Sequence, residues 1–468
     1  MSDNWSTLRE LLLPGARGRV VESALRDAIR TGRLAAGTRL PSSRDLASQL
    51  GVARGTVTLA YTQLIAEGYL VARRGSGTVV SDDVSDGVSE DVSSATRSAE
   101  PADEPAGTWR HDLRPGLPAL SAFPRAAWVA ATRAGLAALT DIELGYPDPA
   151  GLPALRTELA AYLGRVRGVS ARASDLVITH GAAEGMALLA QVLHQTGHRR
   201  IGQENPRHPG QAELLAAHGL DPVPIPVDED GIVVAALADT DCRVVMTTTA
   251  HQFPLGVALH PRRRHELLAW ARRVDGLIVE DDYDAEHRYD RTPVSALQAL
   301  DPARVAYQGS VSKTLAPALR IGWLVTPPHL RAALADRKRL HDLGCSPITQ
   351  SAMAHLLRTG GYDRHLRHTR QLYRQRRDAL LSALAEQLPA WQPVGVAAGL
   401  HVVVRLPKGT DDTAVSQTLA THGINALALS GYHHPDTTPA YPGLVIGYAL
   451  LAPDRLRAAV AELASAIN

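Results

Sequence analysis

The chain has 468 residues, a formal net charge of +1 and a hydrophobic content of 45%. It is too long for one compact domain, and we expect two or three. No apolar run approaches the roughly 20 residues that span a bilayer, and the N-terminus lacks the form of a signal peptide, which argues against a membrane partner. The two cysteines, Cys242 and Cys345, are far apart and fit neither a disulfide nor a metal framework, so we expect a cytoplasmic protein without a metal site.

The first 81 residues carry an excess of positive charge. They hold eleven arginines, no lysine and six acidic residues, although the whole chain is nearly neutral. Such an excess favours contact with nucleic acid, because phosphate binding is a charge-neutralisation effect. The alternative is a solvated arginine-rich face, so charge alone does not decide between the two.

The residue pattern of this segment predicts a winged helix-turn-helix. Asp45 stands three residues after Ser42, in the place of a capping-box acid at a helix start. Three helices followed by an arginine-tipped hairpin are the elements of that motif. The expected elements, in chain order, are helices over 20–29, from Ser42 or Ser43 to Gly51 and over 54–67, and strands over 68–71 and 78–80.

The same segment resembles the DNA-binding domain of the GntR family. The motifs that carry the resemblance are Gly32-Arg33-Leu34, Gly37-Thr38-Arg39-Leu40-Pro41-Ser42-Ser43-Arg44-Asp45-Leu46-Ala47, Gly68-Tyr69 and Gly75-Ser76-Gly77-Thr78. The resemblance implies a DNA-binding domain over 1–81 that contacts double-stranded DNA through Arg44, Arg54, Thr56 and Arg74. Ala53 and Gly55 replace the Ser and Asn common at the start of the recognition helix, which weakens its N-cap.

Residues 82–110 are expected to form a flexible linker. The stretch is acidic, rich in serine and proline and without apolar periodicity, so it cannot bury enough surface to fold. A tether of this kind allows the DNA-binding head to lie over a neighbouring subunit.

From residue 111 to the end, the composition is that of a globular α/β protein. Short apolar runs of strand type alternate with helical segments, which is typical of a mostly parallel sheet that binds ligands at its carboxyl edge. These runs are 176–179, 244–247, 277–280, 305–308 and 321–326. Residues 179–184 follow the first run and open a helix, and free N–H groups at Ala182 and Ala183 would suit an anion.

Lysine is rare in this chain, and one lysine stands among residues that can serve a cofactor. Of 49 basic residues, only three are lysines: Lys313, Lys338 and Lys408. Lysine, unlike arginine, can lose its proton and form an imine with a carbonyl. Ser310, Ser312 and Arg320 flank Lys313 and could anchor the phosphate of an aldehyde cofactor. The alternative is a capping or surface lysine.

The segment around Lys313 resembles the cofactor-lysine segment of fold-type I aminotransferases, in the version found in MocR/GabR-type transcription regulators: Gly309-Ser310-Val311-Ser312-Lys313-Thr314-Leu315-Ala316-Pro317-Ala318-Leu319-Arg320. The resemblance implies a large, mostly parallel α/β domain with a smaller α+β C-terminal domain over 111–468. It implies pyridoxal 5′-phosphate as the cofactor. Asp281 would pair with the pyridine nitrogen, with Asp282 as the second choice, and Tyr283 would meet the ring oxygen. A solvated acidic turn is the alternative for this run.

Several positions depart from the pattern of working aminotransferases. Phe253 stands where the family has a hydrogen-bonding residue at the ring oxygen, and His208 where an aromatic ring stacks on the cofactor, with a surface-loop histidine as the alternative. The resemblance expects an arginine that clamps an α-carboxylate at Leu444 or Val445, and no arginine occurs from there until Arg455. The site is therefore equipped for the cofactor and poorly equipped for an ordinary amino-acid substrate.

Three functions fit these features. We expect a transcription regulator, rather than a dedicated enzyme, whose aminotransferase-like domain senses pyridoxal phosphate itself or an amino compound. The first alternative is an aminotransferase with an appended DNA-binding domain, and a transamination half-reaction could survive in either case. The second is a GntR-type repressor whose aminotransferase-like part only dimerises. The resemblance also implies a head-to-tail homodimer.

Overall fold

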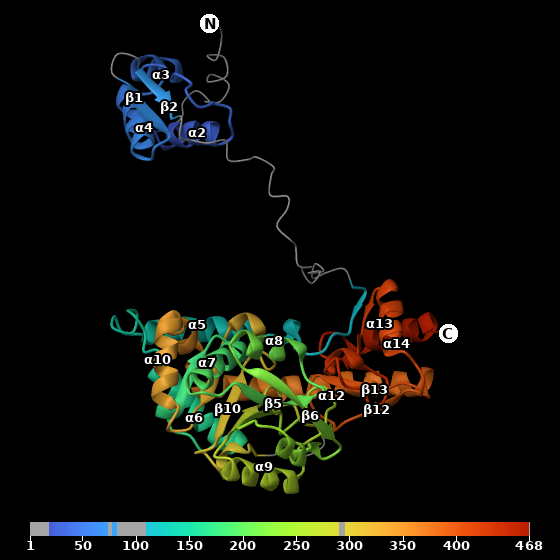
Figure 1. Cartoon of the computed structure of the whole chain (residues 1–468). Helices are drawn as coiled ribbons and strands as arrows, with labels where there is room; N and C mark the ends of the chain where they lie inside the picture. Colours follow the sequence, from blue (N-terminus) through green and yellow to red (C-terminus); the bar gives the residue numbers. More distant parts are fainter. Residues whose placement is uncertain (1–17, 74–76, 82–108, 290–294, 468) are drawn as a thin grey trace. The chain divides into compact units, whose positions relative to one another are not determined.

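The computed structural model describes residues 18–73, 77–81, 109–289 and 295–467. The chain divides into two compact units, Met1–Asp103 and Glu104–Asn468 (Figure 1). Among the helices in these ranges, none has both the length and the hydropathy that a membrane span requires.

The N-terminal unit has the elements of a winged helix-turn-helix. Its helices are α2 (Gly18–Arg30), α3 (Ser43–Leu50) and α4 (Arg54–Ala66), and its antiparallel strands are β1 (Leu70–Arg73) and β2 (Gly77–Val80). Arg39, in the segment before α3, also forms an isolated antiparallel bridge with Val79 of the hairpin. Leu25, Leu46 and Leu64 belong to the apolar core that joins the three helices.

The helix boundaries of this unit follow from their capping residues. The Ser42 hydroxyl accepts a hydrogen bond from the Asp45 backbone N–H (3.2 Å), as the capping prediction requires. Gly51 ends α3 in the left-handed conformation, with φ at 66°. Ala53 makes no side-chain cap at the start of α4, which confirms the weakened N-cap expected from the sequence.

The C-terminal unit is built on an eight-stranded, mostly parallel sheet in the order β4-β11-β10-β9-β8-β5-β6-β7. Within the sheet, β11 and β7 run antiparallel to their neighbours. The strands are β4 (Leu176–Thr179), β5 (Arg200–Asn205), β6 (Asp221–Asp228), β7 (Gly231–Ile232), β8 (Val244–Thr247), β9 (Leu277–Asp281), β10 (Val305–Ser310) and β11 (Gly322–Val325).

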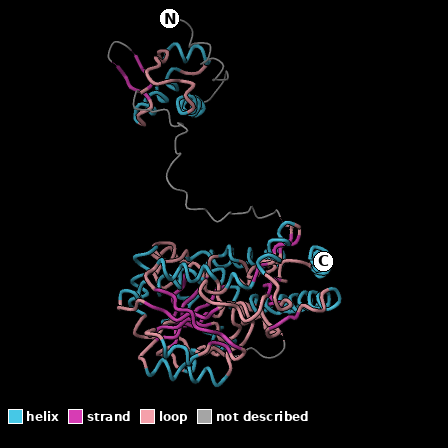
Figure 2. The backbone as a smooth tube through the Cα atoms, turned by 45° about the vertical axis from the view of Figure 1, so that its right-hand side comes forward, coloured by secondary structure: helices cyan, strands magenta, loops and turns pink. Residues whose placement is uncertain are grey.

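Helices cover both faces of this sheet, because alternate strand residues point to opposite sides (Figure 2). Val177 joins a core with α7, α8 and α10, whereas its neighbour Ile178 joins a core with α5, α6, α11 and α12. Ile278 packs against α9. These helices are α5 (Arg125–Ala138), α6 (Pro153–Arg167), α7 (Ala182–Gln195), α8 (Pro209–Ala217), α9 (Pro261–Arg273), α10 (Arg331–Asp342), α11 (Pro347–Arg358) and α12 (Gly361–Gln387).

A smaller α+β part completes the unit. Its four-stranded antiparallel sheet has the order β12-β13-β16-β15, and β3 and β14 form a separate parallel pair. The elements are β3 (His111–Asp112), β12 (Gln392–Val394), β13 (His401–Arg405), α13 (Asp412–Thr421), β14 (Ile424–Asn425), β15 (Leu427–Ala428), β16 (Gly443–Gly447) and α14 (Pro453–Ile467). Short 3₁₀ helices are η1 (Leu120–Ala122), η2 (Ala173–Asp175), η3 (Val234–Asp239), η4 (Gln298–Leu300), η5 (Pro317–Leu319) and η6 (Leu429–Tyr432).

Candidate functional site

The parallel strands of the large sheet end at one edge, and their connecting loops surround one cavity of about 700 Å³. This volume is typical of a small-molecule site, for which roughly 300–1,000 Å³ is usual. All ten residues that the sequence assigns to the cofactor line the cavity: Ala182, Ala183, His208, Phe253, Asp281, Tyr283, Ser310, Ser312, Lys313 and Arg320.

Lys313 lies in the connection between β10 and β11. The two strands are antiparallel neighbours, with Ser310 opposite Gly322, so the connection folds back over the sheet edge. The Lys313 ammonium donates a hydrogen bond to the Gly116 carbonyl (2.5 Å). Burial lowers the pKa of Lys313, and the nearby Asp284 and Asp281 carboxylates oppose that shift. A lowered pKa favours the neutral amine, which is the nucleophilic form.

The two neighbouring aspartates at the end of β9 have different surroundings. Asp281 reaches the cavity, is 5% exposed, and accepts hydrogen bonds from Gln211 (2.8 Å) and Gln308 (3.3 Å). Burial raises the pKa of Asp281 to about 6. Asp282 does not line the cavity and instead pairs with buried Arg167 (2.7 Å). Of the two, only Asp281 presents its carboxylate to a ligand.

Beyond Asp281, the turn after β9 holds a polar cluster that the sequence pattern indicated only in part. The Tyr283 hydroxyl and the Asp284 carboxylate each lie 3.0 Å from Nδ1 of His251. Burial raises the pKa of Tyr283, and burial lowers the pKa of His401, beside His251, to about 4. His401 is therefore neutral at pH 7. The role of Asp284 could have been suspected from its place in the acidic run, one residue after Tyr283.

An anion cradle forms where α7 begins. No side chain caps this helix, so the N–H groups of Ala182 and Ala183 stay available. Gly181 precedes them with φ at 84°, and a Cβ there would lie 3.0 Å from the Arg320 guanidinium. Arg320 itself adopts the left-handed conformation (φ 49°) and donates to the His180 carbonyl. Because Gly181 has no side chain, the Arg320 guanidinium can lie close to the backbone that leads into α7.

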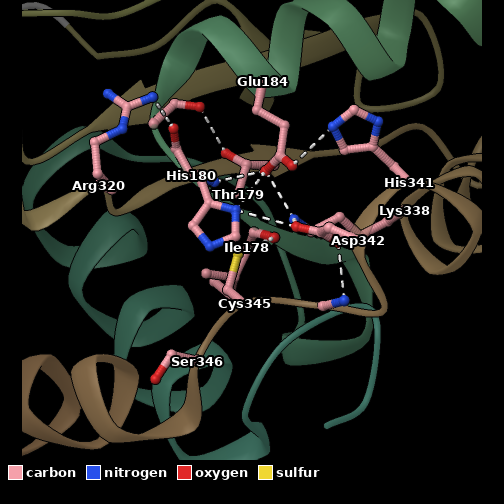
Figure 3. A network of polar contacts seen from close by, with 12 residues as sticks. Ile178, Thr179, His180, Glu184, Arg320, Lys338, His341, Asp342, Cys345 and Ser346 are labelled. Carbon is pink, nitrogen blue, oxygen red and sulfur yellow. Dashed lines mark hydrogen bonds and ion pairs between the residues drawn. The ribbon is translucent and has the colours of Figure 1, made fainter. Parts of the chain in front are cut away.

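An ion-pair network around the buried Lys338 lies beside the start of α7 (Figure 3). The Lys338 ammonium donates to Glu184 (2.7 Å) and to Asp342 (2.5 Å), and His180 lies 3.1 Å from Asp342. Cys345 completes a set of four potential metal ligands together with His180, Glu184 and Asp342. The single Lys338 ammonium contacts both carboxylates, and its pair with Glu184 links α10 to the first turn of α7.

Pyridoxal 5′-phosphate, the cofactor implied by the sequence resemblance, fits these groups. The cavity offers a partly buried amine at Lys313, a carboxylate at Asp281, a phenol at Tyr283 and the cradle at α7 with Ser310, Ser312 and Arg320. These meet an aldehyde, a pyridine nitrogen, a ring oxygen and a phosphate, respectively.

Phe253, one of the positions that depart from aminotransferases, packs against an apolar cluster that contains Tyr432 and Val445. The Phe253 ring lies 5.0 Å from His401, 5.4 Å from Tyr432 and 5.9 Å from His208, centroid to centroid. In β16, Val445 is fully buried. Arg455 donates to the Arg110 carbonyl and does not line the cavity. The start of β16 thus lacks a cationic group for a carboxylate.

The predicted DNA-contacting residues belong to α3, α4 and the hairpin. Arg44 and Arg54 are exposed, and Nε of Arg54 lies 3.5 Å from the Ser43 hydroxyl. Thr56 is half-buried in the first turn of α4. Arg74 lies outside the described residues.

Two family matches cover most of the chain. Residues 18–80 match the bacterial regulatory proteins of the gntR family, and residues 118–465 match aminotransferase class I and II. The second match spans well over half of the chain, and its family uses pyridoxal phosphate, so this is the cofactor of the site.

Curated relatives combine the same two parts. The chain is 35% identical to the HTH-type pyridoxine biosynthesis transcriptional regulator PdxR of Corynebacterium glutamicum, over 95% of this chain and 94% of that protein. It is 32% identical to the probable rhizopine catabolism regulatory protein MocR of Rhizobium meliloti, over 94% and 92%.

Solved aminotransferases share the fold of the second unit. A multiple substrate aminotransferase from Thermococcus profundus matches with a TM-score of 0.70 and 26% identity, over 78% of this chain and 92% of that one. The kynurenine aminotransferase of Pyrococcus horikoshii matches with a TM-score of 0.70 and 26% identity, over 77% and 91%. The chain therefore belongs to the aminotransferase class I and II family and is a DNA-binding transcription regulator of the MocR type, in which a GntR domain precedes an aminotransferase-like effector domain.

Proposed function

We propose that this regulator acts in the cytoplasm as a homodimer and changes its grip on an operator when its cofactor site is occupied. The observation that carries the proposal is the position of Lys313, a half-buried amine with a lowered pKa, in one cavity with the other nine predicted cofactor residues. The signal is pyridoxal phosphate itself or an amino compound that reaches the cofactor.

Each cavity group has a distinct role in this proposal. When bound, pyridoxal phosphate supplies an aldehyde that reacts with amines. Lys313 presents the amine, and Asp281 accepts a hydrogen bond from the protonated ring nitrogen. Tyr283 donates to the ring oxygen. The first N–H groups of α7, with Ser310, Ser312 and Arg320, hold the phosphate.

The absence of a carboxylate-binding arginine from β16 narrows the range of possible effectors. Without an arginine at the start of β16, an α-amino acid gains no carboxylate contact there, which weighs against efficient transamination. An aminotransferase carrying a DNA-binding head remains the second candidate, because the cofactor residues are all present. The name of the Corynebacterium relative, a regulator of pyridoxine biosynthesis, favours pyridoxal phosphate as signal.

A homodimer is supported by an exposed apolar surface on the second unit. Ile142 and Tyr146 are each 89% exposed, and Leu144 is 51% exposed. Leu343, 50% exposed, lies beside this surface, because its neighbour Gly344 packs against Pro147. Clustered apolar side chains of this kind mark interaction surfaces.

Replacing Lys313 with Ala should abolish the visible absorption band of lysine-bound pyridoxal phosphate, because no other lysine lines the described cavity. Lys408→Ala is the matched control, since Lys408 is exposed in the smaller part of the unit. Absorption spectra of both variants with excess cofactor make the test, and a band that survives in the Lys313 variant contradicts the assignment.

Asp281→Asn should weaken cofactor binding and change how stability depends on pH. A carboxyl with a folded pKa near 6 stabilises the folded state when protonated, and that contribution is lost as pH rises through 6. At two pKa units above its ordinary value, the loss is about 2–3 kcal/mol. The parent chain without cofactor should therefore lose about 2–3 kcal/mol of unfolding free energy, relative to the Asp281→Asn variant without cofactor, as pH rises from 4.5 to 7.5.

Urea unfolding of the C-terminal unit at several pH values measures this gain, and calorimetric titration measures cofactor affinity. Asp282→Asn serves as comparison. It removes the negative charge that lies 2.7 Å from Nε of the buried Arg167, so it should destabilise the unit by about 3–5 kcal/mol. If Asp282→Asn impairs cofactor binding without destabilising the unit, Asp282 rather than Asp281 holds the cofactor, and the assignment is wrong.

Arg44→Ala and Arg54→Ala should each weaken binding to the upstream region of the protein's own gene, because each removes a cation that meets a phosphate or a base. The slope of log affinity against log salt should fall by about 1 for each phosphate that the protein no longer neutralises. Arg273→Ala, an exposed arginine at the end of α9, is the control. Mobility shifts at several salt concentrations make the measurement, and unchanged slopes in both variants would remove these residues from the interface.

Ile142→Asp and Tyr146→Asp should shift the chain from dimer to monomer, because a buried carboxylate is costly at an apolar interface. Leu300→Asp, at a half-exposed leucine elsewhere, should leave the oligomeric state unchanged. Sedimentation velocity reports the outcome. A parent chain that is monomeric at micromolar concentration refutes the homodimer.

A further inference from the structure

Arg207 is a cavity residue to which the proposed function gives no role. It lies two residues after the end of β5, and it lines the cavity. Its Nε and Nη1 atoms are buried and have no hydrogen-bond partner among the described residues, and no carboxylate pairs with it there. Burial lowers the pKa of Arg207, with no acid opposing the shift. A half-buried guanidinium with two buried, unpartnered nitrogen atoms is costly, and a ligand anion would reduce that cost.

The other arginines at the cavity already have partners. Arg114 donates to Asp112 (2.7 Å), and Arg320 donates to the His180 carbonyl at the phosphate cradle. Burial lowers the pKa of His401 to about 4, so its ring favours the neutral form. Among the arginines that line the described cavity, Arg207 is therefore the one that neither pairs with an acidic side chain nor belongs to the phosphate cradle.

The surroundings of Arg207 suit a short amino compound. Phe253, Tyr432 and Leu427 add apolar walls to the same cavity. We infer that Arg207 binds the carboxylate of an amino-bearing effector whose amine reaches the cofactor beside Lys313, an inference that rests on the proposed function. A planar guanidinium matches a carboxylate in geometry and charge. Arg207, in the β5–α8 loop, would supply the carboxylate contact that β16 lacks.

The same loop joins the large sheet to the smaller part of the unit. The Arg207 backbone N–H donates to the Tyr432 carbonyl (2.9 Å). Asn205 accepts from the His434 N–H (2.7 Å) and donates to Thr437 (3.0 Å). A ligand held by Arg207 therefore acts on a junction between the two parts, which is where an effector can shift their arrangement.

Stable phosphopyridoxyl adducts test the inference on the full chain. The probes are N-(5′-phosphopyridoxyl) derivatives of glycine, β-alanine and 4-aminobutyrate. Each is matched with an adduct in which an isopropyl group replaces the carboxylate. Calorimetric Kd values are measured for the parent chain, Arg207→Gln, Arg207→Lys and the exposed control Arg273→Gln.

The parent chain and the control should prefer the carboxylate adduct of at least one length by about tenfold to a hundredfold. Arg207→Gln should lose this preference and keep its affinity for pyridoxal phosphate. Arg207→Lys should keep part of the carboxylate preference. Thermal unfolding reports whether each variant is folded. If Arg207→Gln does not fold, Arg207→Lys still tests the inference.

Two results overturn the role of Arg207. One is an unchanged carboxylate preference in Arg207→Gln. The other is an equal loss of affinity for pyridoxal phosphate itself, which would make Arg207 part of the cofactor anchor. A parent chain that binds none of the phosphopyridoxyl compounds instead refutes the proposed cofactor site, so the two failures are distinguishable.

Discussion

The shared carboxyl edge of the parallel strands is the constraint on which the site depends. Strands β4, β5, β8, β9 and β10 run in the same direction, so the loops that follow them meet at one place. Chain segments more than a hundred residues apart thereby surround the Lys313 amine. Because the strand cores are packed on both faces by helices, the loop ends are held rigidly, and the chemistry can reside in short connections.

Burial then gives each of these converging groups its electrostatic character. The same desolvation that lowers the pKa of Lys313 raises that of Asp281, so both groups shift toward their neutral forms when the site holds no cofactor. A ligand that carries a protonated ring nitrogen restores the charge of Asp281. The site therefore keeps two ionisable groups out of water at some cost to stability, a pattern typical of functional sites.

The sequence was informative where a residue type was unusual for its surroundings. Lys313 stood out because the chain otherwise relies on arginine, and the capping of α3 followed from Ser42 and Asp45. The sequence favoured Asp281 over Asp282 only by resemblance, because adjacent residues of an extended segment point to opposite sides and the sequence does not say which side is the cavity. Arg207 escaped notice for a similar reason: an arginine in a polar loop is ordinarily solvated, and only the fold shows its buried nitrogen atoms.

The three lysines show how the chain separates charge from chemistry. Arginine, which does not lose its proton, supplies the exposed charges of the DNA-binding head. Lys313 is placed where a proton can be lost. Lys338, fully buried, is a compact ammonium between two carboxylates under the phosphate cradle, and these bonds raise its pKa although burial opposes them. Lys313 and Lys338 thus have opposite pKa shifts because only Lys338 forms hydrogen bonds to carboxylates. The position of acidic partners, more than burial itself, decides which amine can react.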